Sequence, residues 1–170
     1  DWTHRNGAAS GRYLHVAFSQ TPQQIWSVDI GEGSAKRNRL ISAPIVAGGL
    51  VFTLDAAAQL SAFTTQGQLA WRRSLAPEGQ RPDSGSGGDM AEDGGVLFVT
   101  TGFGQVLALN PATGGEYWSE TLDAPIRAAP TVADGRVYVV ARNDTAYAFS
   151  ATDGATLLPG LVESHTHFSW

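Results

Sequence analysis

Two histidines near the end of the chain have the residue type and spacing best suited to chemistry. His165 and His167 flank one residue and follow the pair Pro159-Gly160. Residues two apart on a strand face the same side, so both imidazoles could bind one Zn²⁺ ion. Such an ion lowers the pKa of a bound water to about 7, and that water could attack an amide or ester carbonyl. We take His165 and His167 as a candidate zinc site.

The sequence around these histidines does not supply the rest of a catalytic centre. A catalytic zinc normally has a third protein ligand, whereas three residues follow His167, and His4 and His15 lie in an early segment. The stretch PGLVESHTHF resembles the first barrel strand of the amidohydrolase superfamily, which implies a β/α barrel of about 250 residues. We therefore expect residues 159–170 to be an orphan tail. It is the start of a fused hydrolase, a join of two reading frames near residue 158, or a His-rich end with adventitious metal affinity.

Three carboxylates form a second candidate site. Asp89, Glu92 and Asp93 lie in or just after the glycine-rich stretch SGSGGD, residues 84–89. That stretch lacks the GxGxxG spacing of a phosphate loop and its strand-and-helix context. We expect these carboxylates to be solvated, in a long loop between repeats and the turn that follows it.

Composition limits the possible functions. The chain has 170 residues, of which 42% are hydrophobic and 16% charged, as in one globular domain. A net charge of −5, with a single short basic cluster at 36–39, argues against a nucleic-acid partner. The lack of cysteine excludes disulfides, thiolate metal sites and cysteine nucleophiles. No stretch approaches the roughly 18 apolar residues of a membrane-spanning helix.

The elements that hold these residues are repeated along the chain. Each repeat has a glycine turn, an alternating strand, a short turn, a second strand, another glycine turn, and an aromatic residue or leucine four positions later. Trp118 follows Trp71 by 47 positions, and Leu158 follows Trp118 by 40. Periods of this size are typical of propellers and solenoids. The three segments that align are 42–71, 87–118 and 128–158.

Alternation within each repeat predicts strands. The segments GLVFTLD (49–55) and RVYVVAR (136–142) contain mostly β-branched, aromatic and aliphatic residues between turns of Gly, Asn and Asp. The sequence therefore predicts an all-β partial propeller of about 3.5 four-stranded blades, followed by a non-propeller tail. The predicted propeller domain is 1–158, the tail is 159–170, and the repeats lie at about 13–30, 42–75, 87–122 and 128–158.

Tryptophan recurs at one position of the repeat, near the start of the outermost strand. An indole there can insert between adjacent blades and bury roughly 150–250 Å². We predict that Trp26, Trp71 and Trp118 dock neighbouring blades; the alternative is that they are ordinary core residues. Leu158 stands at the next expected position, where the repeat loses its register.

Several stretches resemble known propeller families. ALNPATGGEYW and AFTTQGQLAW resemble the tryptophan-docking motif of pyrroloquinoline-quinone (PQQ) propellers. VLFVTTGFGQVLALNPATGGEYW and LDAPIRAAPTVADGRVYVVARNDTAYAFSATDG resemble the BamB (YfgL) family, eight-bladed lipoproteins of the outer-membrane β-barrel assembly machinery. WTHRNG and IWSVDIGEG resemble the mature start of that family, so the resemblance covers residues 2–157.

The resemblance implies a non-enzymatic scaffold on the periplasmic face of the outer membrane. It implies binding to the periplasmic domain of a BamA-like insertase and to unfolded outer-membrane proteins. In the family, a leucine-and-arginine loop before an Ala-Pro step contacts the insertase; the nearest match is Ile126-Arg127, before Ala129-Pro130. We expect Ile126 and Arg127 to form the partner-binding loop, with a plain surface loop as the alternative. The chain starts at Asp1 without a leader, so we expect a processed product or fragment that lacks any signal peptide and lipid anchor.

Quinoprotein dehydrogenases share these blades, so an enzyme is the alternative function. Their chemistry needs PQQ in the central funnel, Ca²⁺ held by carboxylate and amide oxygens, and an Asp base. The sequence shows no convergent set of Asp, Glu and Asn, and no cysteine for the disulfide that lines the cofactor in several such enzymes. It therefore favours a protein without catalytic residues or cofactor. The alternatives are PQQ with Ca²⁺, or Zn²⁺ at His165 and His167.

Overall fold

The computed structural model describes residues 3–4, 21, 23–34, 41–85 and 87–158. The predicted tail at 159–170, with His165 and His167, lies outside the described residues, as does much of the predicted repeat at 13–30. The described residues form three four-stranded antiparallel sheets and one short 3₁₀ helix, without any α-helix. The predicted all-β partial propeller is confirmed.

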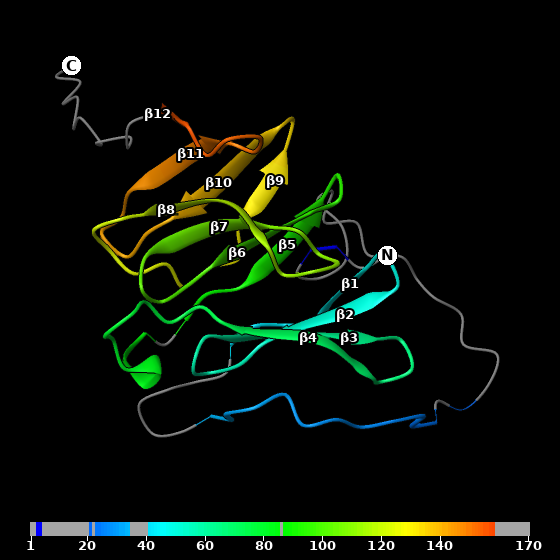
Figure 1. Ribbon diagram of the computed structural model, residues 1–170. Helices are drawn as coiled ribbons and strands as arrows, with labels where there is room; N and C mark the ends of the chain where they lie inside the picture. The colour runs from blue at the N-terminus through cyan, green and yellow to red at the C-terminus, as the bar shows by residue number, and fades with distance from the viewer. Residues whose placement is uncertain (1–2, 5–20, 22, 35–40, 86, 159–170) are drawn as a thin grey trace, which may run out of the picture.

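Each sheet is a meander whose strands pair in chain order (Figure 1). The first sheet comprises β1 (Ile45–Ala47), β2 (Leu50–Leu54), β3 (Gln59–Thr64) and β4 (Leu69–Ser74). The second comprises β5 (Met90–Asp93), β6 (Val96–Thr100), β7 (Gln105–Leu109) and β8 (Glu116–Thr121). The third comprises β9 (Thr131–Ala133), β10 (Arg136–Val140), β11 (Ala146–Ser150) and β12 (Thr156–Leu158). The 3₁₀ helix η1 (Pro82–Ser84) lies in the connection from β4 to β5, which we expected to be a loop throughout.

A two-residue turn with positive φ at both positions closes the first hairpin of every sheet. Such a turn matches the right-handed twist of its strands and requires Gly, Asn or Asp. The turns are Gly48-Gly49, Gly94-Gly95 and Asp134-Gly135. Because the turns are alike, the strand registers that they set are alike.

The same register places equivalent residues on the same face of each sheet. The residues opposite one another are Ile45, Phe52 and Ala62; Ala91, Phe98 and Ala108; and Thr131, Tyr138 and Ala148. We call the face with these residues the forward face, because in the first two sheets it packs on the next sheet. The other, backward face carries the pairs Val51 and Phe63, Leu97 and Leu109, and Val137 and Phe149.

The core lies between successive sheets. One cluster joins the forward face of the first sheet to the backward face of the second; it includes Ile45, Phe52, Leu60, Met90, Leu97, Val99 and Leu109. The other joins the second sheet to the third and includes Phe98, Val106, Ile126, Val137, Val139 and Phe149. Burying one such large side chain is worth roughly 1.5–3 kcal/mol. These clusters therefore hold the sheets together.

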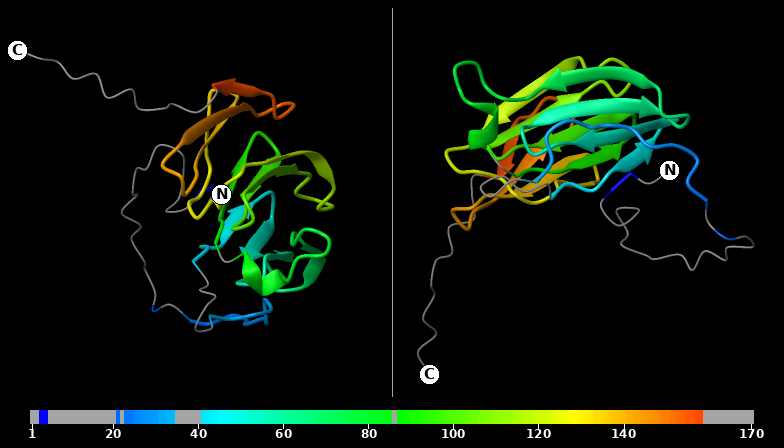
Figure 2. Two further views of the ribbon diagram at one scale, coloured as in Figure 1. Left: turned by 90° about the vertical axis from the view of Figure 1, so that its left-hand side faces the viewer. Right: turned by 90° about the horizontal axis from the view of Figure 1, so that it is seen from below.

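The sheets fan out from their first strands. β1 contacts β5 and β5 contacts β9, while the outer strands lie at the opposite edge of the fan (Figure 2). Residues 23–34 run along the first sheet, in blue at the bottom of Figure 1. Among the described residues there is no helix with the length and apolarity needed to cross a membrane.

Candidate functional site

Two of the recurring tryptophans bridge successive sheets. The indole N–H of Trp71 donates to the carbonyl of Pro111 over 2.9 Å, and that of Trp118 donates to the carbonyl of Ala151 over 3.0 Å. Each acceptor lies in the turn between the third and fourth strands of the following sheet. The two rings therefore hold the same place in successive junctions.

Trp26 makes the same contact from a segment outside the three sheets. Its indole N–H donates to the carbonyl of Thr65 over 2.9 Å, in the turn between β3 and β4. Under each of the three indoles lies a glycine at positive φ: Gly67, Gly114 and Gly154. A side chain at any of these glycines would meet the ring above it.

The loop predicted to bind a partner joins β8 to β9 and is held between two hairpin turns. The N–H of Ile126 donates to the carbonyl of Thr101 (3.3 Å), and the N–H of Arg142 donates to the carbonyl of Pro125 (2.9 Å). Ile126 also forms an isolated bridge with Ala141. The loop is therefore fixed against the turns that follow β6 and β10.

The two residues predicted for partner binding differ in exposure. The Ile126 side chain is fully buried between the second and third sheets, whereas Arg127 is exposed. A Cβ atom on Gly87 would lie 3.0 Å from Cγ of Arg127, so the loop backbone passes close to the arginine stem. Within the described ranges the Arg127 guanidinium has no ion-pair partner. Of this pair, Arg127 is the side chain that a partner can reach.

Asp89 is buried, so the expectation of a solvated carboxylate is wrong for this residue. Its Oδ1 accepts hydrogen bonds from the Ser42 hydroxyl (2.8 Å) and from the N–H of Met90 (2.9 Å). The first and third sheets have Ala43-Pro44 and Ala129-Pro130 where the second has Asp89-Met90. Proline has no N–H at that point, whereas methionine does, and a buried N–H needs an acceptor. Asp89 supplies that acceptor.

His4 lies beside the first strand of the second sheet, where the N–H of Glu92 donates to the carbonyl of Thr3 over 2.7 Å. Its ring is buried, with Nδ1 3.0 Å from the Thr3 hydroxyl and Nε2 without a partner in the described part of the chain. Burial lowers the pKa of His4, against the opposing charges of Asp93 and Glu92. Asp93 is exposed and Glu92 partly exposed, while His15 lies outside the described residues.

An ion pair between the outer strands of the first and second sheets was not found by sequence reasoning. Arg73 Nη2 lies 2.6 Å from Glu116 Oε2, and Arg73 Nη1 donates to the carbonyl of Gly114 over 2.9 Å. The Ser119 hydroxyl donates to Glu116 Oε1 over 2.6 Å. The Ser119 hydrogen bond, followed by Arg73, lowers the pKa of Glu116. The paired residues are 43 positions apart, so no local spacing signals the contact.

The described residues contain no group of three or more His, Asp or Glu that could hold a metal ion.

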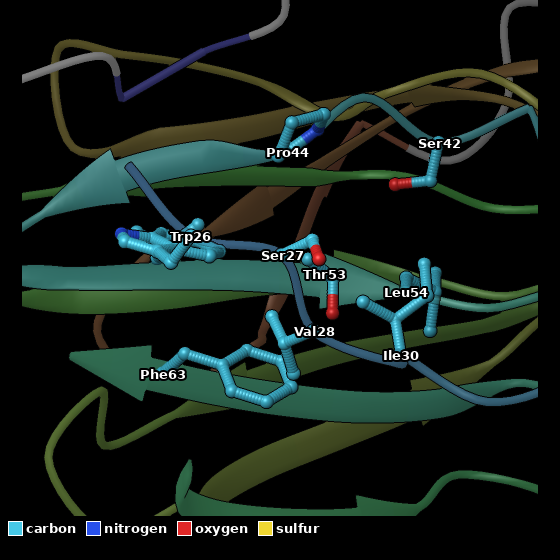
Figure 3. A pocket seen from close by; sticks show the side chains of 10 residues that line it. Trp26, Ser27, Val28, Ile30, Ser42, Pro44, Thr53, Leu54 and Phe63 are labelled. Atoms are coloured by element: carbon cyan, nitrogen blue, oxygen red, sulfur yellow. The ribbon is translucent and has the colours of Figure 1, made fainter. Parts of the chain in front are cut away.

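A pocket of about 380 Å³ lies on the backward face of the first sheet, beside Trp26 and the residues that follow it (Figure 3). Its wall is mainly apolar, and Thr53 reaches it from β2. The residues that line it include Trp26, Val28, Ile30, Pro44, Val51, Thr53 and Phe63.

The sequence profile of the family described as outer membrane protein assembly factor BamB matches residues 60–158, more than half of the chain. The chain belongs to this family. The Vibrio cholerae outer membrane protein assembly factor BamB is 34% identical over 101 residues, which are 56% of this chain and 24% of that protein. The Burkholderia pseudomallei BamB is 28% identical over 133 residues, which are 78% of this chain and 32% of that protein. The chain thus spans about a quarter to a third of the length of these curated relatives.

Solved structures of a BamB protein and of two dehydrogenases have a similar fold. BamB from Moraxella catarrhalis matches with a TM-score of 0.59 and 17% identity, covering 71% of this chain and 40% of that one. A europium-containing methanol dehydrogenase matches with a TM-score of 0.64 and 19% identity, covering 80% of this chain and 26% of that one. A quinohemoprotein alcohol dehydrogenase from Pseudomonas putida matches with a TM-score of 0.59 and 20% identity, covering 73% of this chain and 21% of that one. At such identities the likeness shows a shared propeller fold.

Proposed function

We propose that this chain is part of a non-enzymatic scaffold that binds proteins during the assembly of β-barrels into the outer membrane, on the periplasmic side. The family match and the relatives from Vibrio cholerae and Burkholderia pseudomallei support this role. The proposed partners are the periplasmic domain of a BamA-like insertase and unfolded outer-membrane proteins.

The observation that carries the proposal is the way Arg127 is held. Its loop is fixed by backbone hydrogen bonds to the turns that follow β6 and β10, while its side chain is exposed. A loop that is already ordered loses little conformational entropy on binding, and arginine is enriched at the energetic centres of interfaces. Arg142, which is also exposed, donates its backbone N–H to this loop. Two neighbouring arginines favour a partner surface with carboxylates.

The blades hold this loop in a fixed position. We propose that the repeats at 42–75, 87–122 and 128–158 act as blades, with Trp26, Trp71 and Trp118 docking each blade on the next. The three equivalent indole hydrogen bonds and the glycines under the rings support this assignment.

The experiment is calorimetric titration of this chain with the purified periplasmic domain of a BamA-like insertase. We expect binding, and we expect Arg127→Glu to weaken it at least tenfold. The introduced glutamate would be repelled by the carboxylates of the proposed partner surface. Arg136→Glu is the matched control, since Arg136 is exposed at the start of β10, whereas the Arg127 loop contacts the turn after the end of that strand. Absence of binding, or equal loss in both variants, would overturn the proposal.

The dehydrogenase alternative is tested on the same preparation. After incubation with PQQ and Ca²⁺ and removal of free ligand, we expect no quinone absorbance to remain with the protein. Retention of one quinone per chain would favour an enzyme and count against the scaffold.

A further inference from the structure

Three glycines in the connection from β4 to β5 pack closely on neighbouring turns and loops. They are Gly85, Gly87 and Gly88, and we call them the glycine segment. A Cβ atom on Gly85 would lie 2.5 Å from the Phe103 ring, and one on Gly88 would collide with the carbonyl oxygen of Thr100. Gly85 and Gly88 are both buried. Linkers rich in Gly and Ser are ordinarily flexible, but close contacts hold these glycines in place.

Gly87 is the member of the glycine segment that meets the loop of Arg127. Its carbonyl accepts a hydrogen bond from the N–H of Gly102 over 3.2 Å, which fixes its backbone beside the turn after β6. Its φ is +127°, a conformation that glycine adopts readily and other residues do not. A Cβ atom here would lie 3.0 Å from Cγ of Arg127 and 3.3 Å from the carbonyl oxygen of Ile126. The arginine stem therefore occupies space that a side chain at position 87 would crowd.

This contact limits the directions that the Arg127 side chain can take. Backbone hydrogen bonds to the turns after β6 and β10 hold the loop, but they leave the side-chain torsions of Arg127 free. An arginine side chain loses much rotamer entropy when it is ordered, and that loss opposes binding. The Gly87 backbone restricts the part of the side chain nearest the loop before any partner arrives.

We propose that Gly87 is a positioning residue for the Arg127 site, and that its backbone holds the arginine stem so that the guanidinium is presented to a carboxylate of the partner. This inference rests on the proposed function, because it concerns the same arginine. It adds that the connection between the first two sheets, as well as the loop between β8 and β9, determines how tightly the partner binds.

The test compares Gly87→Ala with Gly79→Ala in calorimetric titrations against the purified periplasmic domain of a BamA-like insertase. Gly79 is the matched control, because it lies in the same connection with a φ of +77° and nothing within 4 Å of its Cβ position. Both variants carry backbone strain, and Gly87→Ala alone crowds the arginine. We expect Gly87→Ala to weaken binding about three- to tenfold, and Gly79→Ala to leave it within about twofold of the wild type.

A double-mutant cycle separates positioning from general damage to the loop. Arg127→Ala removes the side chain that Gly87 contacts, so we expect Gly87→Ala to cause no further loss of binding in that background. A Cβ atom that acted through the Ile126 carbonyl instead would weaken binding equally in both backgrounds. Circular dichroism confirms that each variant is folded before it is compared.

A measurement without the partner tests the positioning by itself. The heteronuclear Overhauser effect of the Arg127 Nε–H group reports how ordered the side chain is, and its signal is assigned by its loss in Arg127→Ala. We expect a smaller effect in Gly87→Ala than in the wild type, because the displaced side chain is then free in solvent. The exposed Arg142 is the internal reference and is expected to stay unchanged.

The outcomes distinguish this inference from the proposed function. Weaker binding by Arg127→Glu together with unchanged binding by Gly87→Ala would overturn the positioning role alone. Equal losses with and without the Arg127 side chain, or an unchanged Overhauser effect in Gly87→Ala, would also overturn it. A wild-type chain that does not bind the insertase domain would overturn the proposed function, and the Overhauser effect would still decide whether Gly87 orders the arginine.

Discussion

The Cβ position of Gly114 lies 2.9 Å from Cε3 of Trp71, closer than a side-chain carbon can approach. Gly114 also has a φ of +71°, so Gly114→Ala adds both backbone strain and a collision with the indole. Gly135 isolates the first effect, because its φ is +70° and nothing lies within 4 Å of its Cβ position.

We predict that Gly135→Ala lowers the free energy of unfolding by about 1–2 kcal/mol, the cost of a left-handed backbone with a side chain. Gly114→Ala is expected to cost about 1–3 kcal/mol more, because the indole must shift. Urea denaturation followed by circular dichroism measures both. Equal losses would show that the contact between Trp71 and Gly114 contributes little to the junction.

Trp71 and Trp26 are expected to contribute unequally to the free energy of unfolding, although their indoles make equivalent hydrogen bonds. The Trp71 ring packs at 6.1 Å from the Phe52 ring and contacts the core cluster between the first two sheets. Trp26 lines the open pocket instead. We predict that Trp71→Ala lowers the free energy of unfolding by about 3 kcal/mol and Trp26→Ala by about 1 kcal/mol. Urea titrations check the order, and a larger loss for Trp26→Ala would show that Trp26 is packed at least as tightly as Trp71 despite the pocket beside it.

Glu116 gives the junction between the first two sheets a dependence on pH. The Ser119 hydrogen bond and then Arg73 lower the pKa of Glu116 below its ordinary value of 4.5. Its contribution to stability is therefore complete above that value and is lost as pH falls through the lower pKa of the folded state. The pair is partly exposed to solvent, so we expect less than about 1 kcal/mol from it.

Glu116→Gln is expected to reduce the loss of stability between neutral pH and about pH 3, measured by urea denaturation at several pH values. Glu120→Gln is the matched control, because Glu120 lies on the same strand and has no ion pair within the described residues. If both variants keep the wild-type pH profile, the Glu116 carboxylate does not stabilise the folded state.

The sequence predicts the blades because their signals are local. Gly48-Gly49 and Gly94-Gly95 close hairpins through their own backbone freedom, and the recurrence of Trp71 and Trp118 marks the outer strands. These signals depend on neighbours in the chain, so they can be recognised without knowing the fold.

Sequence reasoning predicted the tryptophan contacts between blades but missed other contacts between them, because those contacts are not local. Asp89 is buried because it meets Ser42, 47 positions away. The burial of Ile126 follows from the packing of the second sheet on the third, which places it in their common core. Asp89 follows a glycine-rich stretch and Ile126 precedes an arginine, so the sequence suggests that both residues lie on the surface. Only the folded structure shows that both are buried.

The Asp89-Met90 step offers a test of that non-local contact. Asp89→Ala leaves the Met90 N–H and the Ser42 hydroxyl without their acceptor, so we predict a loss of about 1–3 kcal/mol in the free energy of unfolding. The double variant Asp89→Ala/Met90→Pro recreates the Ala-Pro step of the other two sheets and removes the unpaired N–H. We expect it to recover part of the loss, though not all, because Met90 is fully buried in the core and proline fills less of that space. Urea denaturation of both variants decides the matter. A double variant less stable than Asp89→Ala would show that Met90 matters through its packing and that the N–H acceptor is secondary.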